Sequence, residues 1–203
     1  MLSAAQLHAL TTYLRIGAAD ASLALSRWIG RTTLISVERV DQLDLADAMS
    51  VLQESEEPVA SCIMVIEGHI TGQLLLMFDD ASGFSLADLL LEQPPGTAHC
   101  WGEIERSAAL ETANIIGCAY LNAIARLFRE GRVSHEILPS PPKFRQDFPQ
   151  SLLQFALMNQ VQASDTVFLT ETRFTIENSP ANWMLLFIPN ADCLPKLESI
   201  LVP

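Results

Sequence analysis

Basic residues are scarce in this chain. Its 203 residues include 12 Lys and Arg against 24 Asp and Glu, which gives a formal net charge of −12. A surface of that charge repels phosphate backbones and anionic lipids, so it argues against general nucleic-acid binding and membrane-surface binding. The sequence has no run of Lys or Arg that would build a local basic patch. We therefore expect neither nucleic acid nor a membrane among the partners.

Long apolar runs are also missing. The run Ile63–Ile66 stops at Glu67, and Leu74–Phe78 stops at Asp79, far short of the roughly 18 apolar residues that a membrane span needs. No basic stretch precedes an apolar run at the N-terminus, so no export signal is indicated. Because 49% of the residues are hydrophobic, we expect a large core instead.

Paired cysteines and metal-ligand spacings are absent too. The cysteines lie far apart and form no Cys-x-x-Cys pair, so we expect reduced thiols of a cytoplasmic protein. They are Cys62, Cys100, Cys118 and Cys193. The histidines (His8, His69, His99 and His135) show no metal-ligand spacing either. We expect this chain to bind no metal and no cofactor.

Apolar periodicity and turn residues predict one order of elements twice. The first half is predicted to contain a helix over 4–29, a strand over 32–40, a short helix over 41–52, strands over 59–66 and 73–78, and a helix over 80–91. After Pro94-Pro95-Gly96, the second half is predicted to contain a helix over 102–128, a strand over 133–138, a helix over 148–158, strands over 166–177 and 182–188, and a helix over 193–201.

This order predicts an α/β (α+β) class and one internally duplicated domain over 1–203, with repeats of about 1–93 and 100–203. An antiparallel sheet would carry two long helices and smaller helices packed on it. A shift of 99 residues brings Ile16 onto Ile115 and Ala24 onto Ala123, which supports the duplication weakly. Two amphipathic helices that merely look alike would give the same matches.

The second long helix has polar residues that its packing does not require. Ser107, Glu111, Asn114 and Cys118 are spaced 4, 3 and 4 apart, so they form a stripe of about 60° along one side of the helix. The apolar stripe is centred about 100° away and contains Leu110, Ala113, Gly117, Leu121 and Ile124. The helix can therefore bury one side and present the polar stripe. A Glu and an Asn three apart can equally do no more than solvate an exposed face.

The segment Ser107-x-x-x-Glu111-x-x-Asn114, continued as Asn114-Ile-Ile-Gly-Cys-Ala-Tyr-Leu-Asn-Ala123, resembles the signature helix of the CheC-type chemotaxis phosphatases. This family includes CheC, CheX and the middle domain of the flagellar switch protein FliY. The signature is Asp or Ser, three residues, Glu, two residues and Asn. Residues 16–21 resemble the family's first repeat. The helix-first duplication looks more like CheC than like CheX.

The resemblance implies a CheC-like fold and an activity. Such proteins hydrolyse the aspartyl phosphate of the phosphorylated response regulator CheY. By analogy, Asn114 would hold the attacking water in line with phosphorus, and Glu111 would contact the regulator's lysine. Ser107 would support the motif or the interface. Mg²⁺ would sit on the regulator, and a CheD-like deamidase is a second partner that the family suggests.

The first long helix departs from the family pattern. The positions equivalent to Ser107, Glu111 and Asn114 hold His8, Thr12 and Arg15. Arginine has no acceptor and cannot replace the carboxamide, and threonine cannot pair with a lysine as a charge. We therefore predict that only the second site is catalytic.

Other interpretations stay open at this point. The chain could be a non-catalytic module that binds a receiver domain or a CheD-like partner. It could also be a structural protein of unrelated fold with an accidental Glu-x-x-Asn. Because it ends at Pro203, just after the closing helix, we expect it to lie outside the flagellar C-ring unless it is a fragment.

Overall fold

The computed structural model describes residues 1–52, 57–130, 136–158, 166–176 and 179–201. The helices are α1 (Ala4–Ile29), α2 (Leu45–Leu52), α3 (Asp80–Leu90), α4 (Glu103–Glu130), α5 (Pro149–Met158) and α6 (Cys193–Ile200). The strands are β1 (Thr33–Asp44), β2 (Val59–Gly68), β3 (Gly72–Phe78), β4 (Ile137–Pro139), β5 (Lys143–Asp147), β6 (Thr166–Ile176) and β7 (Ser179–Pro189).

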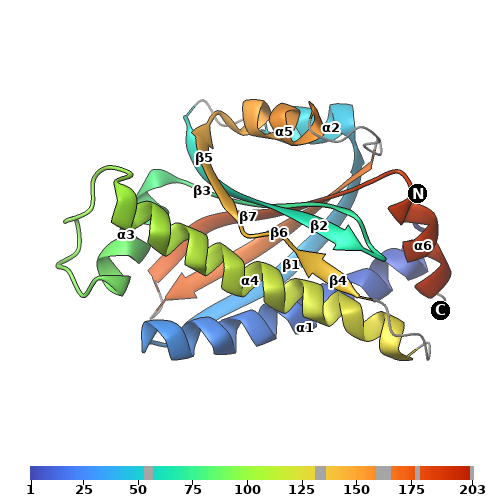
Figure 1. The fold of residues 1–203 in the computed structure, drawn as a ribbon, viewed down its shortest axis with the longest axis horizontal. Helices are drawn as coiled ribbons and strands as arrows, with labels where there is room; N and C mark the ends of the chain where they lie inside the picture. Colours follow the sequence, from blue (N-terminus) through green and yellow to red (C-terminus); the bar gives the residue numbers. More distant parts are fainter. Residues whose placement is uncertain (53–56, 131–135, 159–165, 177–178, 202–203) are drawn as a thin grey trace.

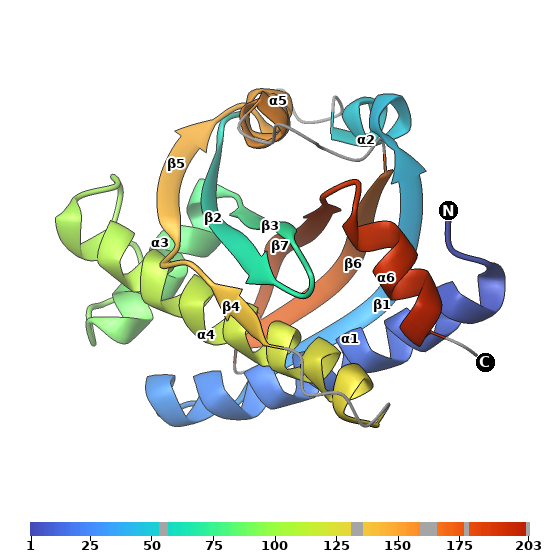
Figure 2. The same ribbon diagram turned by 45° about the vertical axis from the view of Figure 1, so that its right-hand side comes forward.

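All the strands belong to one curled antiparallel sheet (Figures 1 and 2). The strand order is β1-β6-β7-β3-β2-β4, and β5 also pairs with β2. The two edges are therefore β1 on one side and β4 with β5 on the other. The predicted mixed α/β class, an antiparallel sheet with two long helices and smaller ones packed on it, is confirmed.

Helices cover both faces of the sheet (Figures 1 and 2). On one face α1 and α4 lie side by side, and the core beneath them includes Leu10, Tyr120 and Phe168. On the other face α2 and α5 enclose a second core that includes Leu75 and Leu152. Burying apolar surface on both faces explains the hydrophobic excess of the sequence. Within the described residues, no helix combines the length and apolarity needed to cross a membrane.

Local signals fix the ends of α1, which matches the prediction over 4–29. The Ser3 hydroxyl accepts from the Gln6 backbone N–H, and the Gln6 side chain accepts from the Ser3 N–H, which is a capping box. Gly30 ends the helix at φ 72°, a left-handed conformation that glycine adopts without a steric penalty. The other long helix, α4, runs two residues past its predicted C-terminal end.

Sheet pairing overrides the local pattern after β1. The sequence predicted a helix over 41–52, but β1 continues to Asp44, which lies opposite Thr166 of β6. Only Leu45–Leu52 is helical, and the Asp44 carboxylate accepts from the Asp47 N–H at 2.8 Å near its start. The ladder to β6 therefore decides where the strand ends.

The opposite edge was also predicted wrongly. The strand expected over 133–138 is found at Ile137–Pro139, and residues 133–135 lie outside the described part. The stretch after Pro139 was expected to be a loop, but Lys143–Asp147 pairs with β2 as β5. Prolines 141 and 142 have no N–H to donate, so they interrupt this edge between β4 and β5.

Each edge strand pairs with a hairpin from the other half of the chain. β1 follows α1 in sequence but pairs with β6, whereas β4 and β5 follow α4 and pair with β2. The two hairpins meet in the middle, where β3 pairs with β7. The element order is helix, edge strand, short helix, hairpin and helix in both halves. The division into repeats of about 1–93 and 100–203 stays a prediction.

Candidate functional site

The polar stripe of α4 lies at the molecular surface, as its spacing predicted. The side chains of Ser107 and Glu111 are exposed, and Asn114 and Cys118 are half-buried. The neighbouring apolar stripe is buried at Ala113, Gly117, Leu121 and Ile124 and half-buried at Leu110. The structure therefore brings Ser107, Glu111 and Asn114 together on one side of one helix.

Gly117 explains how closely α4 lies on the sheet. A Cβ at this position would stand 2.4 Å from the Met64 sulfur of β2, which is inside van der Waals contact. A side chain here would require the flexible Met64 thioether to move, so glycine favours the close approach of α4 to the sheet. Because this side of α4 is fixed against β2, the polar stripe, about a quarter of a turn around the helix, has a defined direction.

Asn114 is held from within its own helix. The Cys118 thiol donates to Asn114 Oδ1 at a sulfur–oxygen distance of 3.7 Å. The pKa of the Cys118 thiol is raised, first by burial and then by the negative charge of Glu111. The thiol is therefore protonated at neutral pH and can donate. Within the described residues, the Asn114 amide nitrogen has no hydrogen-bond partner, so its two N–H donors can serve a bound partner.

The equivalent positions of α1 are arranged differently. The Thr12 hydroxyl donates to the His8 carbonyl at 3.0 Å, within its own helix. Arg15 Nε donates to the Val37 carbonyl at 3.2 Å, and its Nη2 donates to the Glu38 carbonyl at 3.3 Å. These carbonyls lie at the register shift between Val37 and Arg39, where β1 departs from its regular ladder with β6.

Arg15 is therefore engaged by the sheet edge at the position where α4 has Asn114. Sequence reasoning rejected Arg15 as a substitute for Asn because of its chemistry, but it missed this anchoring. A strand bulge has no pattern in this sequence that would have revealed it. Among the described residues, which exclude His135, no three His, Cys, Asp or Glu side chains lie together as a metal site would require.

Comparison with known proteins gives matches over almost the whole chain. No protein-family model matches it. The CheY-P phosphatase CheC of Bacillus subtilis is 22% identical over 186 residues, which cover 90% of this chain and 87% of that protein. The structure of Thermotoga maritima FliY superposes with a TM-score of 0.77 at 20% identity and covers 99% of this chain and 98% of the other.

A third match is the FliM middle domain of H. pylori, with a TM-score of 0.71, 14% identity and coverage of 98% and 99% of the two chains. The interpretation as a protein of unrelated fold is therefore wrong. The resemblance on α4, the sequence similarity to CheC over nine-tenths of the chain and the shared fold agree. The predicted resemblance to the CheC/CheX/FliY-type chemotaxis proteins is therefore confirmed, in sequence by the similarity to CheC and in fold by FliY.

Proposed function

We propose that this protein is a phosphatase that hydrolyses the aspartyl phosphate of a CheY-like response regulator. The observation that carries the proposal is the polar stripe of α4, with Ser107 and Glu111 exposed and Asn114 half-buried beside them. The name of the B. subtilis relative, a CheY-P phosphatase, supports the same substrate. The fold alone does not assign turnover, because it is shared by FliY and the FliM middle domain.

In the proposed reaction, Asn114 positions the attacking water. Its Oδ1 accepts a hydrogen bond from the water, and its Nδ2 donates to a phosphoryl oxygen. The water oxygen forms a bond to phosphorus, and the bond from phosphorus to the regulator's aspartyl oxygen breaks. The aspartate leaves as a carboxylate; one proton of the water stays on its oxygen, and the other passes to the released phosphate or to solvent. An acyl phosphate is already reactive, so orientation is the missing contribution.

Glu111 lies one turn before Asn114 and would dock the regulator. Its exposed carboxylate can accept from the regulator's lysine in a charge-assisted hydrogen bond. Ser107, a further turn away, would complete the interface. The Mg²⁺ of the reaction belongs to the phosphorylated regulator in this proposal, and this chain supplies no ligand to it.

The site on α1 is proposed to be inactive. Arg15 has no acceptor for a water molecule, and two of its three guanidinium nitrogens, Nε and Nη2, donate to β1 carbonyls. Thr12 has no charge for a lysine. One catalytic stripe per chain, on α4, follows from these differences.

Phosphate release from a CheY-type regulator, phosphorylated with acetyl phosphate and then freed of it, tests the proposal. The parent protein should accelerate release, and Asn114→Ala should lose at least about 100-fold of this acceleration, within the range attributed to positioning of reactants. Asn122→Ala is the matched control, because Asn122 is exposed on the same helix. If Asn114→Ala dephosphorylates the regulator as fast as the parent does, the catalytic assignment is wrong.

The same experiment addresses a binding-only role. A module that docks a receiver domain or a CheD-like partner without turnover would bind the phosphorylated regulator and leave its decay unchanged. Binding measured by calorimetry, together with decay measured in the same buffer, separates the two roles. Glu111→Ala should weaken binding in either case, whereas Asn114→Ala should affect decay alone.

A further inference from the structure

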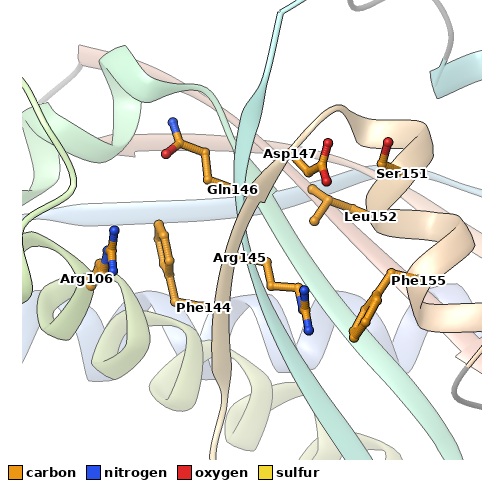
Figure 3. Close-up of a pocket in the computed structure, with 8 residues that line it drawn as sticks. All are labelled: Arg106, Phe144, Arg145, Gln146, Asp147, Ser151, Leu152 and Phe155. Carbon is orange, nitrogen blue, oxygen red and sulfur yellow. The ribbon is translucent and has the colours of Figure 1, made fainter.

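A cavity of about 410 Å³ opens along edge strand β5, and none of the polar-stripe residues of α4 lines it. It is bordered by the first turns of α4, by β5 and by α5, and Figure 3 shows its side chains. On its inner side β5 pairs with β2, and no other described strand pairs with it. The N–H and C=O groups of alternate β5 residues therefore face outward, as on any unpaired sheet edge.

One arginine flanks this edge on each face. On the α4 side, the Arg106 guanidinium lies over the Phe144 ring, 5.5 Å from its centroid. On the α5 side, the Arg145 guanidinium lies over the Phe155 ring at 3.4 Å. Figure 3 shows the two pairs on opposite sides of β5, as expected for the neighbouring residues 144 and 145 of one strand.

Both guanidiniums are held in place but not neutralised. Arg106 and Arg145 are exposed, and within the described part of the chain neither forms an ion pair. Stacking on a ring orients the planar guanidinium and leaves its N–H edge available for a carboxylate. The carboxylate of Asp147 lies at the end of the strand, where it accepts from the Phe148 N–H at 2.8 Å.

Three basic residues outnumber the two acids at this edge, Asp147 and Asp80, the second of which accepts from Gln146 Nε2 at 3.3 Å. With Lys143, three of the chain's 12 Lys and Arg residues lie at this edge, while the whole chain carries −12. The sequence has no basic run to predict this excess, because Arg106 and Arg145 are far apart in the chain. Charged side chains on an edge strand can serve only to prevent aggregation. That role does not require arginines stacked on rings on both sides of an open cavity.

We propose that β5 is a docking edge for an extended acidic segment of a partner protein, which adds to the sheet as a further strand. Successive residues of a strand point to opposite faces, so two neighbouring acidic residues of the segment would reach Arg106 and Arg145. Backbone hydrogen bonds to β5 would supply affinity, and the arginines would supply specificity. A second copy of this chain fits less well, because an antiparallel pairing of two β5 edges centred on Arg145 would place the two Arg145 side chains opposite each other.

The test uses the full chain and a fluorescein-labelled ten-residue peptide, Thr-Val-Thr-Val-Asp-Glu-Thr-Val-Thr-Val. Anisotropy should show saturable binding below 1 mM at low salt. The peptide with Lys-Lys in place of Asp-Glu should not bind. A version N-methylated at alternate residues keeps the charges but cannot form the strand ladder, and it should lose at least ten-fold in affinity. Amide shifts in the ¹⁵N spectrum should be centred on residues 143–147.

Protein variants complete the test. R106Q and R145Q together should lower the affinity for the acidic peptide at least ten-fold. The matched control R27Q replaces an exposed arginine of α1 and should change this affinity less than two-fold. The proposal is overturned if no binding occurs at 1 mM. It is also overturned if the N-methylated peptide binds the unmodified protein, or the double variant binds the acidic peptide, as tightly as the unmodified protein binds the acidic peptide. A concentration-dependent dimer that R145E abolishes would instead assign the edge to a second copy. This inference is independent of the proposed phosphatase activity, so either can fail alone.

Discussion

Gly17 of α1 faces the backbone of Tyr120 in α4 so closely that a Cβ on Gly17 would stand 2.8 Å from the Tyr120 Cα. Real side chains do not approach a backbone atom to this distance. The absence of a side chain at Gly17 therefore lets the two long helices touch, and it fixes the rotation of α4 with its polar stripe. An ion pair at the surface, from Arg126 Nη2 to Asp20 Oδ2 at 2.8 Å, joins the same two helices.

Gly17→Ala should destabilise the protein although alanine is the better helix former. The added methyl group has to push the helices apart, at about 1–3 kcal/mol for overpacking, which outweighs a gain of about 1 kcal/mol in helix propensity. Chemical denaturation followed by circular dichroism should show a lower midpoint. Ala19→Val, on the exposed side of α1, is the control and should change stability by less than about 0.5–1 kcal/mol. A Gly17→Ala protein as stable as the parent would contradict the close contact.

Arg15→Ala should leave regulator dephosphorylation unchanged and lower stability. The substitution removes two hydrogen bonds to the β1 carbonyls, worth about 1 kcal/mol in total at an exposed position. Thr12→Ala should also leave the rate unchanged. Activity and thermal unfolding measured on the same preparations check both. Loss of activity in either variant without unfolding would mean that the α1 site contributes to catalysis.

Asp88→Ala should cost more stability than any surface acid. The Asp88 side chain is almost fully buried, and it accepts from the backbone N–H groups of Gly96, Thr97 and Ala98 at 2.7, 3.0 and 2.7 Å. Removing it leaves the Gly96 and Ala98 N–H groups without their acceptor and the Thr97 N–H with the Pro94 carbonyl alone, at 3.2 Å, so we expect a loss of about 2–3 kcal/mol. Urea unfolding measures the effect, with Glu103→Ala, an exposed acid of α4, as the control. Equal losses in both variants would refute the role of this carboxylate.

Iodoacetamide at pH 8 should modify Cys100 first. Cys100 is exposed, whereas Cys62 and Cys193 are buried. Burial raises the pKa of Cys62 to about 12 and that of Cys193 to about 11, so both thiols stay protonated and inert in the folded protein. Peptide mass spectrometry over time should find Cys118 slower than Cys100, because its pKa is also raised. If Cys62 is labelled as fast as Cys100 in the native protein, the burial of Cys62 is contradicted.

The parts of the fold with local causes could be predicted from the sequence. α1 has its own cap at Ser3 and its own stop at Gly30, so its limits are set within the helix. The polar stripe of α4 follows from side-chain spacing on a helix, and so it was also predictable. The end of β1 and the existence of β5 depend on pairing with β6 and β2, which no nearby residue encodes.

The same distinction applies to the sites. The motif from Ser107 to Asn114 is contiguous on one helix, so spacing and resemblance were sufficient to locate it. The anchoring of Arg15 requires a register shift in a strand more than twenty residues away. The cavity along β5 depends on the contact of Arg106 with Phe144, which follows only once α4 and β5 are placed next to each other. Physical contacts between remote segments are what sequence patterns leave out.

The exchange of edge strands has a consequence for the order of folding. Thr33 of β1 lies opposite Ile176 of β6, so β1 has no partner until most of the chain has been synthesised. Contacts this distant in sequence carry a large loop-closure cost and slow the folding reaction. During synthesis β1 would be an unpaired strand of twelve residues, exposed to association with other chains. We therefore expect slow refolding in stopped-flow experiments and a dependence on chaperones at the ribosome.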